Sequence, residues 1–155
     1  MYCKDATAPS LTQVEQTVLR CLRTAFARPL ADAATHYRDA TETQLTACFA
    51  DLFARLRRLD PYILRVGSPD TRPTVFELQL VHLVNLARFR DCKAKNAVVR
   101  WLFPEDEVLA AKLLVGTLGH LAAQLARNER NDEAASLLLR ERMVALIVHR
   151  ARHVR

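Results

Sequence analysis

Histidine and carboxylate side chains are the first candidates for chemistry, because histidine titrates near neutral pH and both bind metal ions. His82 and Asn85 are three residues apart, so a helix would place them on one face. That spacing suits a metal-ligand or catalytic pair, but we favour a buried hydrogen bond, because buried polar groups need partners in any case. His36 and Asp39 share the spacing, yet no third ligand completes a set, and we predict no metal site.

Larger signatures of catalysis are missing from the sequence. The chain contains no Glu-x-x-His motif, which marks di-iron helical bundles, and no glycine-rich phosphate loop. Neither paired carboxylates nor a nucleophile with its base can be assembled. We therefore expect a protein that binds no cofactor and is not an enzyme. If it were an enzyme, its site would lie near His82 or His120.

The four cysteines, Cys3, Cys21, Cys48 and Cys92, are widely spaced and follow neither a zinc-binding nor a disulfide pattern. Cys21 and Cys48 fall on apolar helical faces, where a free thiol behaves as a small hydrophobic group. We interpret the cysteines as reduced and structural.

Two further features bear on location. The N-terminal residues lack the apolar region of a signal peptide. The longest uncharged run, from Leu113 to Ala126, is too short to cross a bilayer. Together with the reduced cysteines, these features predict a cytoplasmic or host-intracellular protein that does not enter a membrane.

Two basic stretches carry the positive charge of the chain: each has a net charge of +4, and the remaining residues are close to neutral at −2, which leaves +6 overall. Residues 88–100 hold one acidic residue against Arg88, Arg90, Lys93, Lys95 and Arg100. Residues 140–155 hold one acidic residue against Arg140, Arg142, Arg150, Arg152 and Arg155. Clustered arginines bind phosphates or carboxylates. The stretches are therefore candidate binding surfaces for an acidic protein partner or for nucleic acid.

The composition predicts the elements that must position these residues. Of 155 residues, 50% are hydrophobic and only three are glycine, while the strong helix formers Leu, Ala and Arg dominate. We predict an all-α fold, with residues 1–155 forming a single domain: a helical bundle of five to seven helices with a central apolar helix.

Capping boxes at Ser10-x-x-Gln13, Thr41-x-x-Gln44 and Thr74-x-x-Glu77 predict three helix starts. A short helix is expected at 30–37, after Pro29. Residues 60–73 hold three of the six prolines, so they predict an irregular loop between the N-terminal and C-terminal helices. That loop is either functional or a plug for the end of the bundle.

From Thr74 onward, apolar residues occur on almost every helical face, which requires a central position or a partner. The first helix of this part should run to about residue 96, or with a break to 103, where Pro104 ends it. A second should run from about 105 to 127. The polar residues 128–132 predict a turn before a last helix, whose apolar residues are Leu137, Leu138, Leu139, Met143, Val144, Leu146, Ile147 and Val148.

Gly116 and Gly119 lie within the 105–127 segment, where glycine costs up to about 1 kcal/mol relative to alanine. They indicate a close helix crossing, within the subunit or between subunits. The surplus of apolar helical surface predicts a homodimer formed through the 105–127 or the 132–152 helix.

The function that these features favour is that of a non-enzymatic helical interaction protein, such as a regulator, an adaptor or a secretion-related factor. Such a protein acts through protein–protein contacts. The alternative is a nucleic-acid-binding protein that uses residues 88–100 and 140–155.

Overall fold

The computed structural model describes residues 10–27, 40–59 and 64–153, with backbone alone at 132, 135, 136, 143 and 145–153. Five helices and no strand lie in these ranges: α1 (Gln13–Ala27), α3 (Ala40–Leu59), α4 (Val75–Arg88), α5 (Cys92–Leu102) and α6 (Val108–His153). The predicted all-α fold is therefore confirmed. The helix expected at 30–37 lies outside the described residues.

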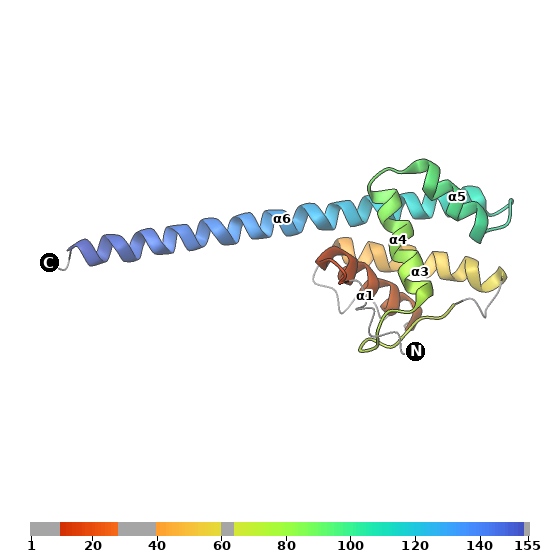
Figure 1. The fold of residues 1–155 in the computed structure, drawn as a ribbon, viewed down its shortest axis with the longest axis horizontal. Helices are drawn as coiled ribbons and strands as arrows, with labels where there is room; N and C mark the ends of the chain where they lie inside the picture. Colours follow the sequence, from red (N-terminus) through yellow and green to blue (C-terminus); the bar gives the residue numbers. More distant parts are fainter. Residues whose placement is uncertain (1–9, 28–39, 60–63, 154–155) are drawn as a thin grey trace, which may run out of the picture.

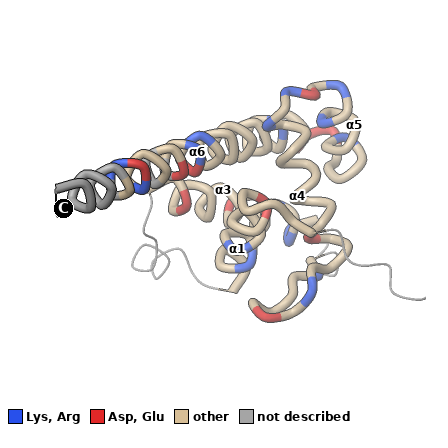
Figure 2. The backbone as a smooth tube through the Cα atoms, turned by 60° about the vertical axis from the view of Figure 1, so that its left-hand side comes forward, with Lys and Arg blue, Asp and Glu red and all other residues tan. Residues whose placement is uncertain are grey.

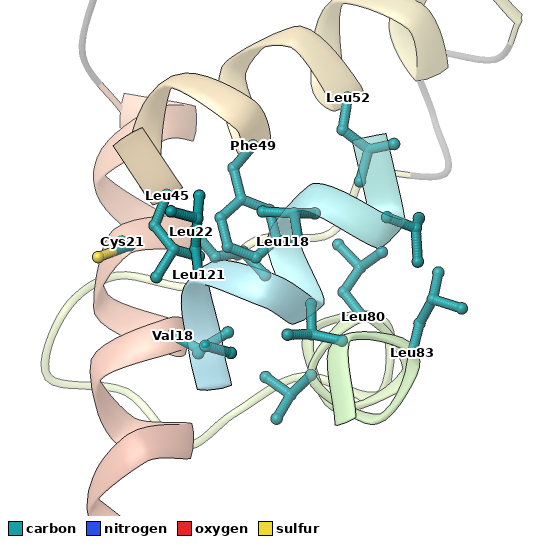
Figure 3. Close-up of a cluster of buried hydrophobic side chains, with 14 of the residues drawn as sticks. Val18, Cys21, Leu22, Leu45, Phe49, Leu52, Leu80, Leu83, Leu118 and Leu121 are labelled. Carbon is teal, nitrogen blue, oxygen red and sulfur yellow. The ribbon is translucent and has the colours of Figure 1, made fainter. Parts of the chain in front are cut away.

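The other four helices gather around one half of α6, and the other half extends away from them (Figure 1). α6 packs most extensively against α4 and α3, and α1 packs on α3. The core between them is made of aliphatic and phenylalanine side chains, as Figure 3 shows, among them Leu22, Leu45, Phe49, Leu52, Leu83 and Leu118. The predicted central apolar helix is the N-terminal half of α6.

Two helices begin with a capping box. The hydroxyl of Thr12 accepts a hydrogen bond from the Glu15 amide (3.3 Å), and the Glu15 carboxylate accepts one from the Thr12 amide (2.8 Å). Thr74 and Glu77 form the same pair of bonds at the start of α4, as predicted. The start predicted at Ser10 is two residues early, because Thr12 and not Ser10 caps the helix. The Glu15 carboxylate of the observed capping box suits the positive end of the helix dipole better than the neutral side-chain amide of Gln13 in the predicted one.

The break between α4 and α5 occurs at residues 89–91. Arg90 adopts a left-handed conformation (φ 60°), and the Asp91 amide donates back to the Leu86 carbonyl (2.9 Å). These are the features of a Schellman motif, which ends a helix. Asp91 then caps α5 by accepting from the Ala94 amide (3.2 Å). Of the two predicted alternatives, the one in which the helical segment continues to about residue 103 with a break is therefore confirmed.

Two expected helix boundaries are wrong. Thr41 lies inside α3, which begins at Ala40, and the turn expected at 128–132 is part of α6, which runs unbroken for 46 residues. Residues 128–132 contain neither proline nor glycine. In a helix interior, asparagine and aspartate are each less favourable than alanine by no more than about 0.7 kcal/mol, and a long helix tolerates this loss of stability. α6 is therefore about 69 Å long at 1.5 Å per residue.

α6 crosses α4 at Gly119. A Cβ atom at this position would lie 2.5 Å from the Ala87 Cβ atom and 2.7 Å from the backbone nitrogen of Arg88. Only glycine permits this approach. At Gly116, one turn earlier, an added Cβ atom would meet nothing within 4 Å. The two glycines therefore differ in role: Gly119 lies in a crossing within the chain, and Gly116 faces open space.

The apolar residues of α4 and α6 are not all enclosed by the chain. Val75 of α4 is 74% exposed, and Leu109 and Leu113 of α6 are 72% and 67% exposed. Residues Val108–Asn131 are also long and apolar enough to cross a membrane by length and composition alone. In the bundle, one side of this segment, including Val115 and Leu118, is core.

The glycine pair supplies a matched test of the crossing. Gly119→Ala is expected to lower the free energy of unfolding by roughly 1–3 kcal/mol, because the added methyl group overlaps the α4 backbone. Gly116→Ala should instead raise it by up to about 1 kcal/mol through helix propensity. Urea denaturation of both variants measures the difference. Equal effects at the two positions would contradict the crossing.

Candidate interaction surfaces

The C-terminal part of α6 projects from the bundle (Figure 1). We define residues 130–153 as the projecting segment. Every side chain described in it is exposed, including four large apolar ones: Leu137 (59%), Leu138 (57%), Leu139 (61%) and Val144 (59%). A helix in a protein gains most of its stability from packing an apolar face. Within the described residues, no other element packs on these leucines.

Charge changes sign along this part of α6. Residues 129–133 contain three acidic residues and one basic residue, whereas 140–152 contain four basic residues and one acidic residue. At the junction with the bundle, burial and the neighbouring charge of Glu133 raise the pKa of Glu129, and Arg88 opposes that change. Glu129 and Glu133 are i,i+4 neighbours of like charge, which destabilises a helix on its own.

A second surface lies on α5. Lys93, Ala97, Arg100 and Trp101 are all exposed, Trp101 to 77%, and their spacing places them on one side of the helix; we name this set the α5 face. Phe89, just before α5, is 69% exposed and lies under the guanidinium of Arg88, 4.7 Å from the ring centre. Sequence reasoning missed these aromatics. The sequence did contain a signal for Trp101: it follows Lys93 by eight residues, a spacing that places both on the same side of a helix.

The predicted basic residues do not form one surface. In the first stretch, Arg90, Lys93 and Arg100 are exposed, while Arg88 and Lys95 are half-buried. In the second, Arg140 and Arg142 are exposed, and the side chains of Arg150, Arg152 and Arg155 are outside the description. Arg140 lies 21 residues beyond Gly119, which is about 31 Å along α6. The charges of α5 and of the projecting segment lie apart in Figure 2.

Two histidines, His82 and His120, have side chains that the structure describes. His82 and His120 are both exposed. Asn85 donates to the Glu15 carboxylate of α1 (2.8 Å) in a partly buried hydrogen bond. The buried hydrogen bond expected for His82 and Asn85 is therefore wrong for His82, which lies on the exposed side of α4. No group of three His, Cys, Asp or Glu residues in the described ranges could hold a metal ion. His36 and Asp39 lie outside those ranges.

A shallow hollow of about 210 Å³ lies between α3 and α6, lined by Asp51, Ala54, Arg55, Arg58 and Leu114. Arg55 is paired with Glu107 at 2.7 Å. These residues place no nucleophile beside a base, so the hollow offers no catalytic constellation.

The cysteines follow their predicted faces. Burial raises the pKa of the Cys21 thiol to about 11, and burial together with Asp51 raises that of Cys48. Cys92 is exposed, and none of these three forms a disulfide. High thiol pKa values disfavour the reactive thiolate. Cys21 and Cys48 are thus packing residues, and Cys3 lies outside the described ranges.

The Pro-rich loop is held by a buried ion pair that sequence reasoning missed. The Arg23 Nε and Nη2 atoms donate to the two carboxylate oxygens of Glu77, at 2.8 and 2.9 Å. Their side chains are 8% and 0% exposed. The guanidinium also donates to three loop carbonyls, those of Pro69, Thr71 and Arg72. The described part of the loop, 64–73, is thereby tied to α1 and α4.

The environment of this pair fixes its charge. Burial alone would raise the pKa of the Glu77 carboxyl, but hydrogen bonds from Arg23 and from the Thr74 and Gly67 amides outweigh burial, and the pKa is lowered. The hydrogen bond to Glu77 raises the pKa of Arg23. Both groups are therefore charged at neutral pH. Both carboxylate oxygens of Glu77 accept hydrogen bonds in this network. The network therefore explains how the described part of the loop is held in place.

No protein-family model matches the chain, and no curated protein or solved structure is significantly similar to it. Its function has to be inferred from the chemistry of the two exposed surfaces.

Glu77→Gln tests the buried pair. It should lower the free energy of unfolding at pH 7 by roughly 3–5 kcal/mol, because the Arg23 charge stays buried without its counter-charge. Since the folded pKa of Glu77 is lowered, its contribution is present above pH 4.5 and is lost as the pH falls through the folded pKa. Urea denaturation between pH 7 and pH 3 should therefore show a shallower acid decline in the variant.

The surface pair Arg20–Glu42, in which Arg20 is 61% exposed, provides the control. Glu42→Gln should change stability by no more than about 1 kcal/mol. Equal losses for Glu42→Gln and Glu77→Gln would show that the buried network has no special role.

Proposed function

We propose that this chain is a non-enzymatic interaction protein, of the regulator or adaptor type, that presents the projecting segment of α6 to a helical protein partner. One observation carries the proposal: Leu137, Leu138, Leu139 and Val144 are all more than half exposed on a helix that leaves the bundle. Burying a leucine side chain is worth about 1.5–3 kcal/mol, so a partner that covers these side chains gains substantial free energy.

The three consecutive leucines also indicate the shape of the contact. Successive residues are rotated by about 100° around a helix, so Leu137, Leu138 and Leu139 spread over more than half of its circumference. A partner must therefore enclose the segment on several sides, as helical grooves and helix pairs do. The bundle supports this role by anchoring the other half of α6 through Leu118, Leu121 and Leu125.

The leucines can be tested with a control on the same helix. Leu137→Gln, Leu138→Gln and Leu139→Gln in one chain should reduce recovery of the partner at least tenfold, as expected when more than about 1.4 kcal/mol of binding energy is lost. Leu109→Gln with Leu113→Gln changes two leucines within the bundle that are even more exposed, at 72% and 67%, and should leave recovery unchanged.

The measurement is quantitative mass spectrometry of proteins that co-purify with each tagged variant from the native source. Both variants should keep the helical circular dichroism of the wild type, since all five positions are exposed. Unchanged recovery with the triple variant would refute the proposal.

Nucleic-acid binding is the second candidate, and the α5 face is the observation that favours it. An exposed Trp101 beside Lys93 and Arg100 combines a stacking platform with positive charge. Proteins that bind single-stranded nucleic acid use that combination.

This candidate predicts salt-dependent binding to a single-stranded oligonucleotide. Trp101→Ala should weaken binding by roughly 1–3 kcal/mol at any salt concentration, whereas Arg100→Gln should also reduce the salt dependence. Fluorescence anisotropy at two salt concentrations measures both effects. Absence of binding at low salt would eliminate this candidate and leave the protein-partner proposal untouched.

A further inference from the structure

We infer that two copies of this chain pair in antiparallel orientation through the side of α6 that faces away from the bundle, with a two-fold axis beside Gly116. This surface is separate from the projecting segment, so the inference goes beyond the proposed function and does not rest on it. Three features support it: the geometry of the exposed side, the open space at Gly116, and the order of large, small and charged residues along the helix.

Six residues in the N-terminal half of α6 lie on one side of the helix, opposite the core. At about 100° per residue they fall within an arc of about 80°, and we name this set the outer face: Leu109, Leu113, Gly116, His120, Ala123 and Arg127. Leu118 and Leu125, on the other side of the helix, are buried in the core. Leu109 and Leu113 are 72% and 67% exposed, so the described part of the chain leaves the apolar end of the outer face uncovered.

Gly116 lies at the middle of the outer face, and no contact within the described residues requires a glycine there. An added Cβ atom would meet nothing within 4 Å, although glycine is less favourable than alanine in a helix interior. Glycine allows another backbone to approach closely, as Gly119 does where α6 crosses α4. A second helix that crosses α6 at Gly116 would therefore explain the residue.

The outer face is complementary to itself when a two-fold axis passes beside Gly116. Residues whose numbers add up to about 232 then lie opposite each other, so Leu109 of one copy meets Ala123 of the other. Leu113 meets His120, and both are rotated from Leu109 in the same direction, by about 40° and 20°, so they share one flank of the pair. Each leucine is thus set against a different side chain and not against its own copy.

Charged residues at the two ends of the outer face fit the same register. Arg127 is exposed eleven residues after Gly116, and Glu105 is exposed eleven residues before it, in the turn that leads into α6. Continuing the helix backward would place Glu105 about 40° from Leu109, on the side of the outer face. An antiparallel pair therefore sets Arg127 of each copy against Glu105 and the exposed Asp106 of the other.

A parallel pair would oppose like charges instead. It would set Arg127 against Arg127 and Glu105 against Glu105, and like charges across an interface disfavour a wrong pairing. The order of charges therefore selects the antiparallel arrangement, and the complementarity of the outer face to itself identifies the occupant as a second copy. The two projecting segments leave this dimer at opposite ends and stay free to bind a partner.

The mass of the full-length protein tests the pairing. Sedimentation equilibrium at tens of micromolar should give twice the mass of the 17.6 kDa chain. Gly116→Leu should weaken the dimer at least tenfold, because its side chain separates the two backbones at the axis. The monomer should keep its stability, since the position is open and leucine is a better helix former. Ala134→Leu, at an exposed position of α6 beyond the outer face, should leave the mass unchanged.

Charge reversal tests the register. Arg127→Glu should weaken the dimer about tenfold, because it replaces attraction to Glu105 and Asp106 by repulsion at both ends of the interface. Adding Glu105→Arg and Asp106→Arg to the same chain should restore the dimer. Arg142→Glu makes the same charge change in the projecting segment and should have no effect. Failure of the combined variant to recover would overturn the proposed register.

Orientation is tested by cross-linking with a short bis-maleimide. Leu109→Cys and Ala123→Cys are made in separate chains in which Cys3 and Cys92 are replaced by serine. Position 109 of one copy faces position 123 of the other in the antiparallel pair, whereas the two copies of either position are about 21 Å apart. A cross-linked dimer should form in the mixture after subunit exchange and in neither variant alone. Cross-linking of each variant with itself would overturn the antiparallel arrangement.

A wild-type mass of 17.6 kDa at these concentrations overturns the dimer, and equal dimer affinity for the wild type and Gly116→Leu overturns the interface at Gly116. The proposed function fails or stands separately, through the triple-leucine variant of the projecting segment. Leu109→Gln with Leu113→Gln should be monomeric and should still recover the partner. A dimeric Leu109→Gln with Leu113→Gln variant would also contradict pairing through the outer face.

Discussion

The bidentate ion pair between Arg23 and Glu77 is the contact on which the arrangement of the other elements depends. It joins α1 to α4 and fixes the described part of the Pro-rich loop between them. A buried ion pair offsets its desolvation only when the remaining hydrogen-bonding groups are satisfied. Here, loop carbonyls and amides satisfy them, so the loop and the two helices form one unit that presents the other side of α4 to α6.

That unit determines where α6 is held. Because Gly119 brings the two backbones into contact, a shift of α6 by one residue along α4 would place Leu118 or His120 in the crossing. The part of α6 up to Ala126 is therefore anchored on the core, and the remainder continues as a straight extension (Figure 1). The bundle acts as a base, and the segment that can meet a partner is the one it leaves uncovered.

Both exposed surfaces combine apolar side chains with charge, but they do so differently. The α5 face has one aromatic residue among cations on a short helix of the bundle, whereas the projecting segment has leucines between charges of opposite sign. Charge of one sign favours an anionic ligand, and charges in alternating blocks favour a partner with the complementary order. The two surfaces are therefore suited to different partners.

The sequence by itself determined the all-α fold, the capping box at Thr74 and the end of a helix before Pro104, because these depend on groups within a few residues of each other. It did not determine that α6 is unbroken, because a polar run carries no steric block. The partner of Arg23 lies 54 residues away, and the exposure of Trp101 depends on which side of α5 meets the bundle. Only the tertiary structure decided these features, since burial and distant charge pairing arise when the helices pack.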